Sequence, residues 1–349
     1  MDNQENKHKR RVRYKGTHPK KFSEKYKELH PEKYSDTIEK VIRKGSTPAG
    51  MHISICVKEI LDFLKIQPGQ KGLDATLGYG GHASKMLACL KGQGHLYGLD
   101  VDPIEIEKTK ERLAKKGYGP EILTIKQLNF ANIDTLLPET GLFDFVLADL
   151  GVSSMQIDNP KRGFSYKTEG PLDLRLNPQK GKSAAERLAT MTESELIGML
   201  EENADEPYAG EIARAIMKEQ SSGDGIETTA QLREVIEKAL VFIPEKTRKD
   251  SVKKSCQRSF QALRIDVNNE FEVLYDFLEK LPNILAPGGR VAILSFHSGE
   301  DRLVKKSFKC LMREGIYSEV APTVIRPSSQ ECNENPRARS TKMRWAIKA

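Results

Sequence analysis

Apolar runs alternate with segments of helical periodicity over residues 51–150. Runs that predict buried strands cover residues 72–77, 95–99, 121–128 and 143–150. Apolar positions at helical spacing occupy residues 51–64, 83–90 and 103–116. Strands that alternate with helices predict an α/β fold built on a doubly wound, Rossmann-like parallel sheet.

The alternation stops near residue 155, and the next strand pattern comes only at residues 290–296. The residues between these points contain patterns that mark helix starts. These are capping boxes at Ser183 and Glu186, Thr192 and Glu195, and Thr228 and Gln231. Further helices are predicted at residues 208–220 and 268–281. We therefore expect a sheet domain of six or seven strands at residues 46–154 and 284–349, with a helical domain inserted at residues 155–283.

The stretch from residue 71 to 102 carries the first chemical signal. Its order is strand, glycine turn, helix and strand, with Gly78, Gly80 and Gly81 in the turn and Asp100 at the end of the second strand. Such a turn brings a ligand close to the helix start, and the acid can accept hydrogen bonds from ribose hydroxyls. The alternative is a turn whose glycines serve packing alone. The acids at both strand ends favour a nucleoside pocket.

Asp74 indicates which nucleoside. The glycines have the spacing GxGG rather than the dinucleotide pattern GxGxxG, and Asp74 precedes them on the first strand. A carboxylate at this position can pair with the cationic methionine portion of S-adenosylmethionine (SAM), whereas it would repel the pyrophosphate of a dinucleotide. Because parallel strands end at one edge of a sheet, we expect Asp74, Asp100, Phe130 and Asp149 to converge there.

Composition and charge narrow the class of protein. The chain of 349 residues is 38% hydrophobic and 30% charged, an ordinary composition for a water-soluble protein. No apolar run approaches the ~20 residues of a membrane span, so we expect a cytoplasmic protein. The 5 cysteines show no CxxC spacing, and neither a disulfide framework nor a metal site is expected.

The net charge of +7 lies entirely in a basic N-terminal arm, residues 1–45. Residues 7–21 contain only basic charges, interleaved with Tyr14, which is typical of a segment that neutralises phosphates. RNA contact and a merely solubilising tail are both consistent with this pattern.

Several long motifs resemble one family, the bacterial MraW-type small-subunit rRNA methyltransferases. They are DATLGYGGH (74–82), DLGVSSMQID (149–158), RGFSY (162–166), GPLDLRLNP (170–178), SAAE (183–186), FQALRIDVN (260–268), APGGRVAILSFHSGEDR (286–302) and NPRARS (335–340). The resemblance implies a class I SAM-dependent fold that methylates the exocyclic N4 amine of a decoding-centre cytidine. It also implies SAM as cofactor, and as partner small-subunit rRNA or the assembled small ribosomal subunit.

The resemblance also implies roles for individual residues. The expected cofactor contacts are Gly80, Gly81 and His82 at the methionine portion, Asp100 at the ribose, Phe130 at the adenine, and Asp149 and Gln156 completing the pocket. His82 has an alternative role as a helix-start residue used through its backbone. Phe130 has one as an ordinary core residue.

Catalysis needs an acceptor for the protons of a weakly nucleophilic amine. We expect Asp149 and the Ser153 hydroxyl to serve as acceptors, with His297 as a candidate proton acceptor or, alternatively, a structural residue. Candidate contacts to the RNA backbone are Lys253, Lys254, Arg258, Arg264, Arg337, Arg339 and Arg344, with internal salt bridges as the alternative.

Two departures from the family pattern bear on the substrate. Met155 stands where many relatives have proline, and Gly299 replaces a larger apolar residue. Because of these two departures, a non-catalytic rRNA-binding assembly factor on the same fold is retained as an alternative function. A nucleotide-dependent oxidoreductase is opposed by the glycine spacing, and the sequence leaves the oligomeric state open, a homodimer included.

Overall fold

The computed structural model describes residues 54–223 and 225–349, with the side chain of Ser154 left out. The basic arm and its expected RNA contact lie outside these residues. A single sheet of seven strands organises the described chain, in the order β3-β2-β1-β4-β5-β7-β6. The strands are β1 (Lys71–Asp74), β2 (His95–Asp100), β3 (Leu123–Gln127), β4 (Phe143–Asp149), β5 (Leu285–Ser295), β6 (Tyr317–Val320) and β7 (Lys342–Lys348).

Strands β1 to β5 pair in parallel with one another, whereas β7 runs antiparallel to both β5 and β6. The predicted doubly wound sheet is confirmed, and β1 lies between β2 and β4. Consequently the carboxyl ends of β1, β2 and β4 lie side by side at one edge.

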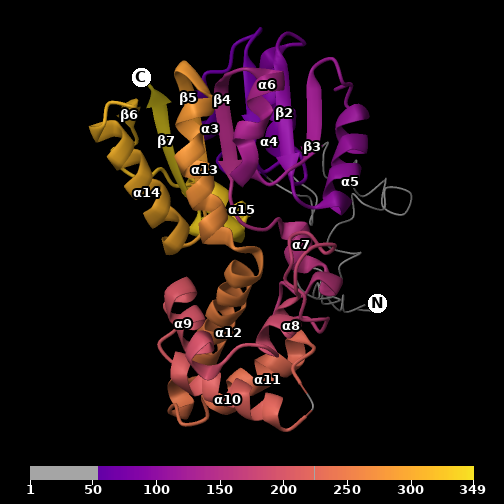
Figure 1. Cartoon of the computed structure of the whole chain (residues 1–349), viewed down its shortest axis with the longest axis vertical. Coiled ribbons are helices and arrows are strands. Elements are labelled where there is room, and N and C mark those ends of the chain that lie inside the picture. Colours follow the sequence, from indigo (N-terminus) through magenta and orange to yellow (C-terminus); the bar gives the residue numbers. More distant parts are fainter. Residues whose placement is uncertain (1–53, 224) are drawn as a thin grey trace, which may run out of the picture. The chain divides into compact units, whose positions relative to one another are not determined.

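Helices pack on both faces of the sheet (Figure 1). They are α3 (Val57–Leu64), α4 (Gly81–Leu90), α5 (Pro103–Ala114), α6 (Leu137–Thr140), α13 (Glu270–Ile284), α14 (Ser298–Arg313) and α15 (Ser329–Glu334), with the 3₁₀ turns η2 (Phe130–Leu136) and η4 (Pro336–Ser340). Strand β4 shows the two-faced burial directly. Phe145 and Leu147 pack with α3 and α4, whereas Val146 and Ala148 pack with α13 and α14. This alternation follows from the period of two along a strand.

The helical insertion has a core of its own. It comprises α7 (Ser154–Asp158), η3 (Pro160–Arg162), α8 (Ala184–Leu188), α9 (Glu193–Ala204), α10 (Ala209–Ser221), α11 (Thr229–Ala239) and α12 (Glu245–Asn268). All three predicted capping boxes form, at Ser183, Thr192 and Thr228. The helices enclose a buried apolar cluster that runs from Phe164 to Leu263. Figure 1 shows α12 leading back toward the sheet through α13.

Two details differ from the sequence patterns. Strand β6 is not marked by any of them, because only Tyr317 and Val320 of its four residues are buried. Strand β5 begins at Leu285, before the expected Arg290, because Leu285 already pairs with Phe143; after a register shift at the Pro-Gly-Gly stretch, Arg290 pairs with Phe145. Among the described residues, no helix combines the length and the apolar character that a membrane crossing requires.

Candidate active site

Three carboxylates end adjacent strands: Asp74 on β1, Asp100 on β2 and Asp149 on β4. Burial raises the pKa of Asp74 to about 7, of Asp100 to about 6 and of Asp149 to about 7. Within the described residues, Oδ2 of Asp74 and Oδ1 of Asp149 are buried and accept no hydrogen bond. The edge of the sheet therefore presents acids whose charge the fold itself leaves uncompensated.

The glycine turn is shaped for close approach. Gly80 has φ +76°, and a Cβ there would lie 2.7 Å from Thr109 Cγ2. The Gly78 amide donates to Asp100 Oδ2 at 2.8 Å, and the Thr109 hydroxyl donates to the Gly78 carbonyl at 2.6 Å. Strand β2 and helix α5 thus hold the turn in place, and only glycine fits at residue 80.

His82 lies in the first turn of α4, and its imidazole is buried against the strand-tip acids. Its Nε2 donates to the Ile55 carbonyl at 2.9 Å, so that nitrogen carries the hydrogen. Its Nδ1 lies 3.5 Å from Asp149 Oδ2. Burial lowers the pKa of His82 and keeps the ring neutral. The His82 imidazole therefore contacts the strand-tip acids directly, in addition to any role of the His82 backbone at the start of α4.

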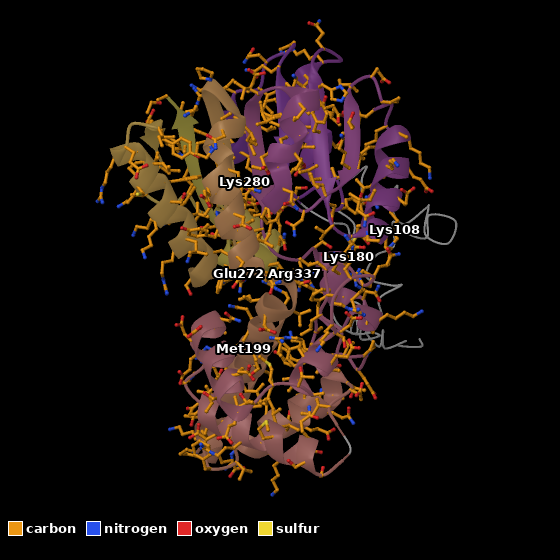
Figure 2. All side chains as sticks on the ribbon, in the orientation of Figure 1. Lys108, Lys180, Met199, Glu272, Lys280 and Arg337 are labelled. Carbon is orange, nitrogen blue, oxygen red and sulfur yellow. The ribbon has the colours of Figure 1, made fainter. Side chains whose placement is uncertain are left out.

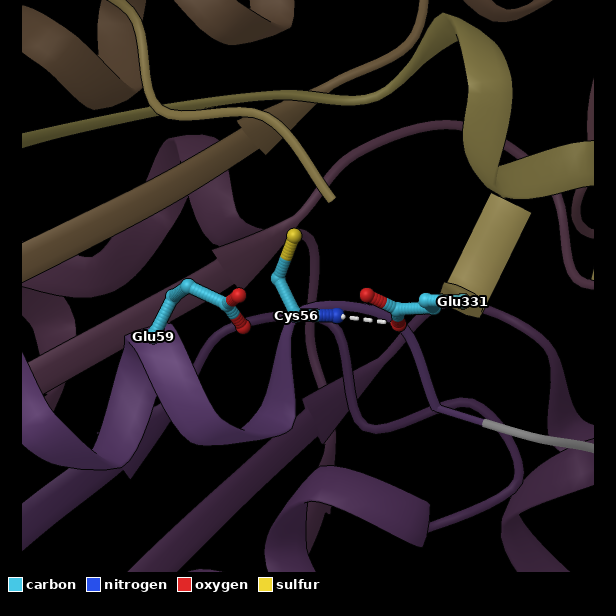
Figure 3. A group of neighbouring side chains, drawn as sticks. All are labelled: Cys56, Glu59 and Glu331. Carbon is cyan, nitrogen blue, oxygen red and sulfur yellow. Dashed lines mark hydrogen bonds between the residues drawn. The ribbon is translucent and has the colours of Figure 1, made fainter. Parts of the chain in front are cut away.

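Cys56 and two glutamates fix the segment that carries Ile55. The Cys56 amide donates to Glu331 Oε1 at 2.8 Å, which ties α15 to the start of α3. Figure 3 shows the carboxylates of Glu59 and Glu331 on either side of Cys56. Burial and these two acids raise the pKa of the thiol far above its ordinary value, so it stays protonated. The contact keeps the Ile55 carbonyl in place for His82.

Asp102, just past β2, joins the site to the helical insertion. It is fully buried and accepts hydrogen bonds from Arg162 Nη1 at 2.7 Å and from Gln156 Nε2 at 3.0 Å. Arg162 Nη2 also donates to the carbonyls of Arg175 and Leu176. The Asp102 amide in turn donates to Asp100 Oδ1 at 2.9 Å. A short chain of contacts therefore runs from the predicted ribose acid into the insertion.

Gln156 and Ser153 make hydrogen bonds within the contact between the sheet and the helical insertion. The Ser153 hydroxyl accepts from the Gln156 amide at 3.2 Å, and Gln156 Oε1 accepts from the Ser153 amide at 2.9 Å. This capping box starts α7. Gln156 therefore holds the loop after β4 to Asp102, whereas the Ser153 hydroxyl keeps its hydrogen available for donation.

His297 follows β5, the neighbour of β4, and its imidazole is 9% exposed. Nδ1 has no partner among the described residues, and Nε2 lies 3.2 Å from Glu300 Oε1 without the alignment of a hydrogen bond. Although burial opposes ionisation of Glu300, His297 and Arg264 hold its pKa below the ordinary value. Glu300 in turn adds to the raised pKa of Asp149, so the two groups are close.

The Gly299 departure has a local explanation. A Cβ at Gly299 would lie 2.6 Å from Phe271 Cζ and 3.2 Å from His297 Nδ1. The Phe271 ring lies 5.8 Å from the His297 ring, centre to centre. Phe271 therefore occupies the space that a larger side chain at residue 299 would need. Met155 is likewise a packed residue, with 3% exposure.

Phe130 lies at the start of η2, after β3. Its ring makes an edge contact with Phe277 at 5.1 Å, and it is partly buried against the sheet core. Part of the ring thus serves packing, and the rest is accessible.

The candidate RNA contacts divide into two groups. Arg264 forms a two-bond ion pair with Glu270, Arg344 pairs with Asp301, and Arg337, labelled in Figure 2, pairs with Asp158. For these three, the salt-bridge alternative describes what the structure contains. Exposed lysines Lys253 and Lys254, half-buried Arg258 and exposed Arg339 remain candidates.

The absence of a metal site was also a prediction from the sequence. Among the described residues, two groups place potential ligand atoms within 4.8 Å of one another: Cys56 with Glu59 and Glu331, and Glu270 with His297 and Glu300. In both groups, donor atoms already make contacts within the protein. Glu331 binds the Cys56 amide, and Glu270 binds Arg264 through both oxygens.

Comparison with known proteins decides the family. The model of the MraW methylase family matches residues 49–349. The chain belongs to this family. Ribosomal RNA small subunit methyltransferase H 1 of Lachnoclostridium phytofermentans is 75% identical over 348 residues, covering 100% of this chain and 95% of the relative. Ribosomal RNA small subunit methyltransferase H 2 of Alkaliphilus metalliredigens is 69% identical over 349 residues, covering 100% of both.

Among solved structures, an rRNA methylase from Streptococcus thermophilus aligns with 85% of this chain and 99% of its own, at 12% identity and a TM-score of 0.40. A likeness at this score supports no conclusion about fold or function.

Membership in this family makes S-adenosylmethionine the cofactor, and the residues present fit it. Its methionine portion carries a sulfonium and an ammonium. The buried, unpartnered Oδ2 of Asp74 can accept a hydrogen bond from the ammonium, and the carboxylate of Asp149 adds negative charge that favours a cation. The turn at Gly80 leaves room for close approach of the backbone.

Proposed function

We propose that this protein methylates the exocyclic N4 amine of a cytidine in the decoding centre of small-subunit rRNA. Support for the coarser activity, SAM-dependent methylation of rRNA, comes from family membership and from relatives that carry this name across their full length. The choice of a cytosine amine rests on the motif resemblance and on the chemistry of Asp149. The single observation that carries the proposal is the pair of unpartnered, buried oxygens at neighbouring strand tips.

The reaction places one main demand on the protein. When bound, S-adenosylmethionine supplies an electrophilic methyl group on its sulfonium. A cytosine amine is a weak nucleophile because its lone pair is delocalised into the ring. As the new N–C bond forms, the nitrogen becomes cationic and must lose a proton, so the site needs a hydrogen-bond acceptor that can become a base.

Asp149 meets this demand. A pKa of about 7 keeps the carboxyl near the point of balance between its ionised and protonated forms at neutral pH. In its ionised form, Oδ1 accepts a hydrogen bond from the amine and then takes the proton, so that charge is conserved at the site. His82 Nδ1 lies 3.5 Å from Oδ2, the other oxygen of the same carboxyl.

Ser153 and His297 take supporting roles in this proposal. Because the Ser153 hydroxyl accepts a bond from the Gln156 amide, it can donate to an acceptor on the pyrimidine ring. His297, whose Nδ1 is unpartnered and whose ring is almost buried, is proposed to receive the proton after Asp149.

The base must leave its stack to reach this edge of the sheet, as in other enzymes that modify bases. The helical insertion, the proposed substrate-recognition domain, joins the cofactor edge through Arg162 and Asp102. It is therefore placed to present the everted nucleotide, and the basic arm at residues 1–45 is proposed to add contacts to phosphate.

Cofactor binding is tested at Asp100. Replacing Asp100 with alanine removes the proposed ribose acceptor, and we expect SAM binding to disappear from a calorimetric titration. Asp134→Ala is a matched control, because Asp134 is a half-exposed aspartate that pairs with Lys280 on the surface. Equal affinities for both variants and the unmodified protein would contradict the assignment of Asp100.

The activity itself is tested by incubation with methyl-labelled SAM and small subunits that lack the modification, followed by mapping of the labelled nucleotide. Label on the N4 atom of a decoding-centre cytidine is the expected result. Label on another nucleotide would overturn the choice of target. Tight binding to the subunit without any label would instead favour a non-catalytic assembly factor.

A further inference from the structure

A cavity of about 420 Å³ opens in the helical insertion, away from the strand-tip acids. One face of the first half of α12 forms one wall, and α11 and the loop after η3 form the others. Residues 245, 249, 252, 253 and 256 of α12 share that face because they recur at steps of three or four. None of the catalytic or cofactor-binding residues predicted from the sequence lines this cavity, whereas Lys253, a predicted RNA contact, does.

The lining is rich in positive charge. Arg233, Arg248, Lys249 and Lys253 line the cavity, against two acids, Glu237 and Glu245. Within the described residues, neither Lys249 nor Lys253 takes part in a hydrogen bond or an ion pair. Two ammonium groups therefore face solvent at the cavity without a direct ion pair, and the four basic side chains outnumber the two acids, which suits a phosphate.

Tyr166 adds an aromatic wall. Its ring makes an edge contact with Phe260 at 6.0 Å, which fixes the ring plane, and its side chain is half-buried. A phosphate needs no such surface, whereas an unstacked nucleobase does. Glu237 and Glu245 supply acceptors for exocyclic amines, which a phosphorylated protein side chain does not carry.

Helix α12 connects this cavity to the active site. Arg264, near its end, pairs with Glu270 and lies close to Glu300 beside Asp149. At about 1.5 Å per residue, Lys253 lies roughly 16 Å and Lys249 roughly 22 Å along the helix from Arg264. At about 3.4 Å per stacked nucleotide, this span corresponds to roughly five to seven nucleotides.

We propose that the cavity binds one unpaired nucleotide of the rRNA substrate, with its phosphate on Lys249 and Lys253 and its base against Tyr166, about five to seven nucleotides from the target cytidine. The inference rests on the proposed function and adds a second contact that sets which nucleotide reaches Asp149.

The test uses the full chain and unmodified small-subunit rRNA made by transcription. The double variant Lys249→Gln/Lys253→Gln is expected to raise KM for the rRNA at least tenfold, with kcat and the Kd of SAM unchanged. It should also lower the slope of log affinity against log salt by about 0.7, because the contact to one phosphate is lost. The matched control is Lys218→Gln/Lys238→Gln, which removes two exposed lysines of the same insertion that do not line the cavity.

A second pair of variants tests the aromatic wall. Tyr166→Phe keeps the ring and is expected to leave KM unchanged, whereas Tyr166→Leu is expected to raise it about tenfold. Equal KM values for the lysine variant and its control, with the unmodified protein active, would overturn the cavity assignment alone. An unmodified protein that transfers label neither to free rRNA nor to small subunits that lack the modification would instead refute the proposed function. A defect seen with assembled subunits but not with free rRNA would assign the cavity to a ribosomal protein and overturn the RNA contact.

Discussion

Two aspartates beyond or at the ends of β2 and β4, the strands on either side of β1, are treated in opposite ways by the same fold: Asp102 and Asp149. Asp102 has no exposed surface, and its carboxylate is matched by the Arg162 guanidinium, the Gln156 amide and the Ile104 backbone amide. Asp149 also lies at the edge of the sheet, but its Oδ1 has no partner and its pKa is raised to about 7.

The difference separates a structural acid from a functional one. A buried charge is tolerated when the protein supplies its counter-charge and hydrogen bonds, and removing one partner is then costly. An acid left uncompensated raises the free energy of the ligand-free fold, and a cation that binds there recovers it. The strand-tip acids therefore mark the cofactor site, whereas Asp102 joins the sheet to the insertion.

The largest effect is expected from breaking the compensated pair. Arg162→Met keeps most of the side-chain volume but leaves Asp102 without its counter-charge, so we expect the free energy of unfolding to fall by about 3 to 5 kcal/mol. Urea unfolding followed by circular dichroism measures this change. Arg187→Met removes a more exposed ion pair with Asp266 and should cost about 1 kcal/mol or less. Similar losses for both variants would mean that Asp102 is not a specially compensated charge.

A smaller, opposite effect on stability is expected at the uncompensated acid. The folded-state pKa of Asp149 lies above its unfolded value, so the folded protein binds the proton more tightly and stability falls as pH rises from about 4 to about 7. At pH 8, Asp149→Asn removes this cost and should raise the free energy of unfolding by about 1 to 2 kcal/mol. The same variant should lose activity at least 100-fold, because the proton acceptor is gone.

The assignment of Asp149 requires both the gain in stability and the loss of activity in Asp149→Asn. If Asp149→Asn is less stable at pH 8 or retains full activity, the claim that Asp149 lacks a counter-charge because of its function is wrong. Asp102→Asn serves as the comparison, because it alters a compensated acid and should destabilise the protein.

The smallest expected effect is the pH dependence of cofactor affinity. A cationic ligand needs ionised carboxylates, so SAM affinity should fall about tenfold between pH 7.5 and pH 6 as Asp74 and Asp149 take up protons. Titration calorimetry in two buffers of different ionisation enthalpy would detect the protons released on binding. In Asp74→Asn, the remaining affinity should depend less on pH. A flat profile for the unmodified protein would mean that these acids do not receive the cation.

Periodicity and local motifs predicted most of the architecture. The four strand patterns up to residue 150 and the three capping boxes are confirmed, because each depends on residues close together in the chain. Strand β6 was missed because a four-residue edge strand with two exposed positions carries almost no alternation. The convergence of Asp74, Asp100 and Asp149 followed from the parallel topology alone.

Contacts between residues that are far apart in the sequence could not be predicted from periodicity or local motifs. Nothing local to Arg162 shows that it pairs with Asp102, 60 positions away, or that Ile55 accepts from His82. The charge pattern of α12 likewise could not distinguish Arg264, committed to Glu270, from exposed Lys253. Whether the predicted contacts at Gly80, Gly81, Phe130 and Gln156 hold the cofactor, as the family resemblance implies, remains a prediction.

The antiparallel strand β7 has a consequence for how the chain matures. It lies between β5 and β6 in the sheet, yet it follows β5 by about 45 residues in the chain. At roughly 5 to 20 residues per second, synthesis leaves the outer backbone of β5 unpaired for about 2 to 9 seconds. An unpaired, apolar strand edge invites association with other nascent chains. Slow decoding of residues 296–341 would lengthen that interval and lower the yield of soluble protein.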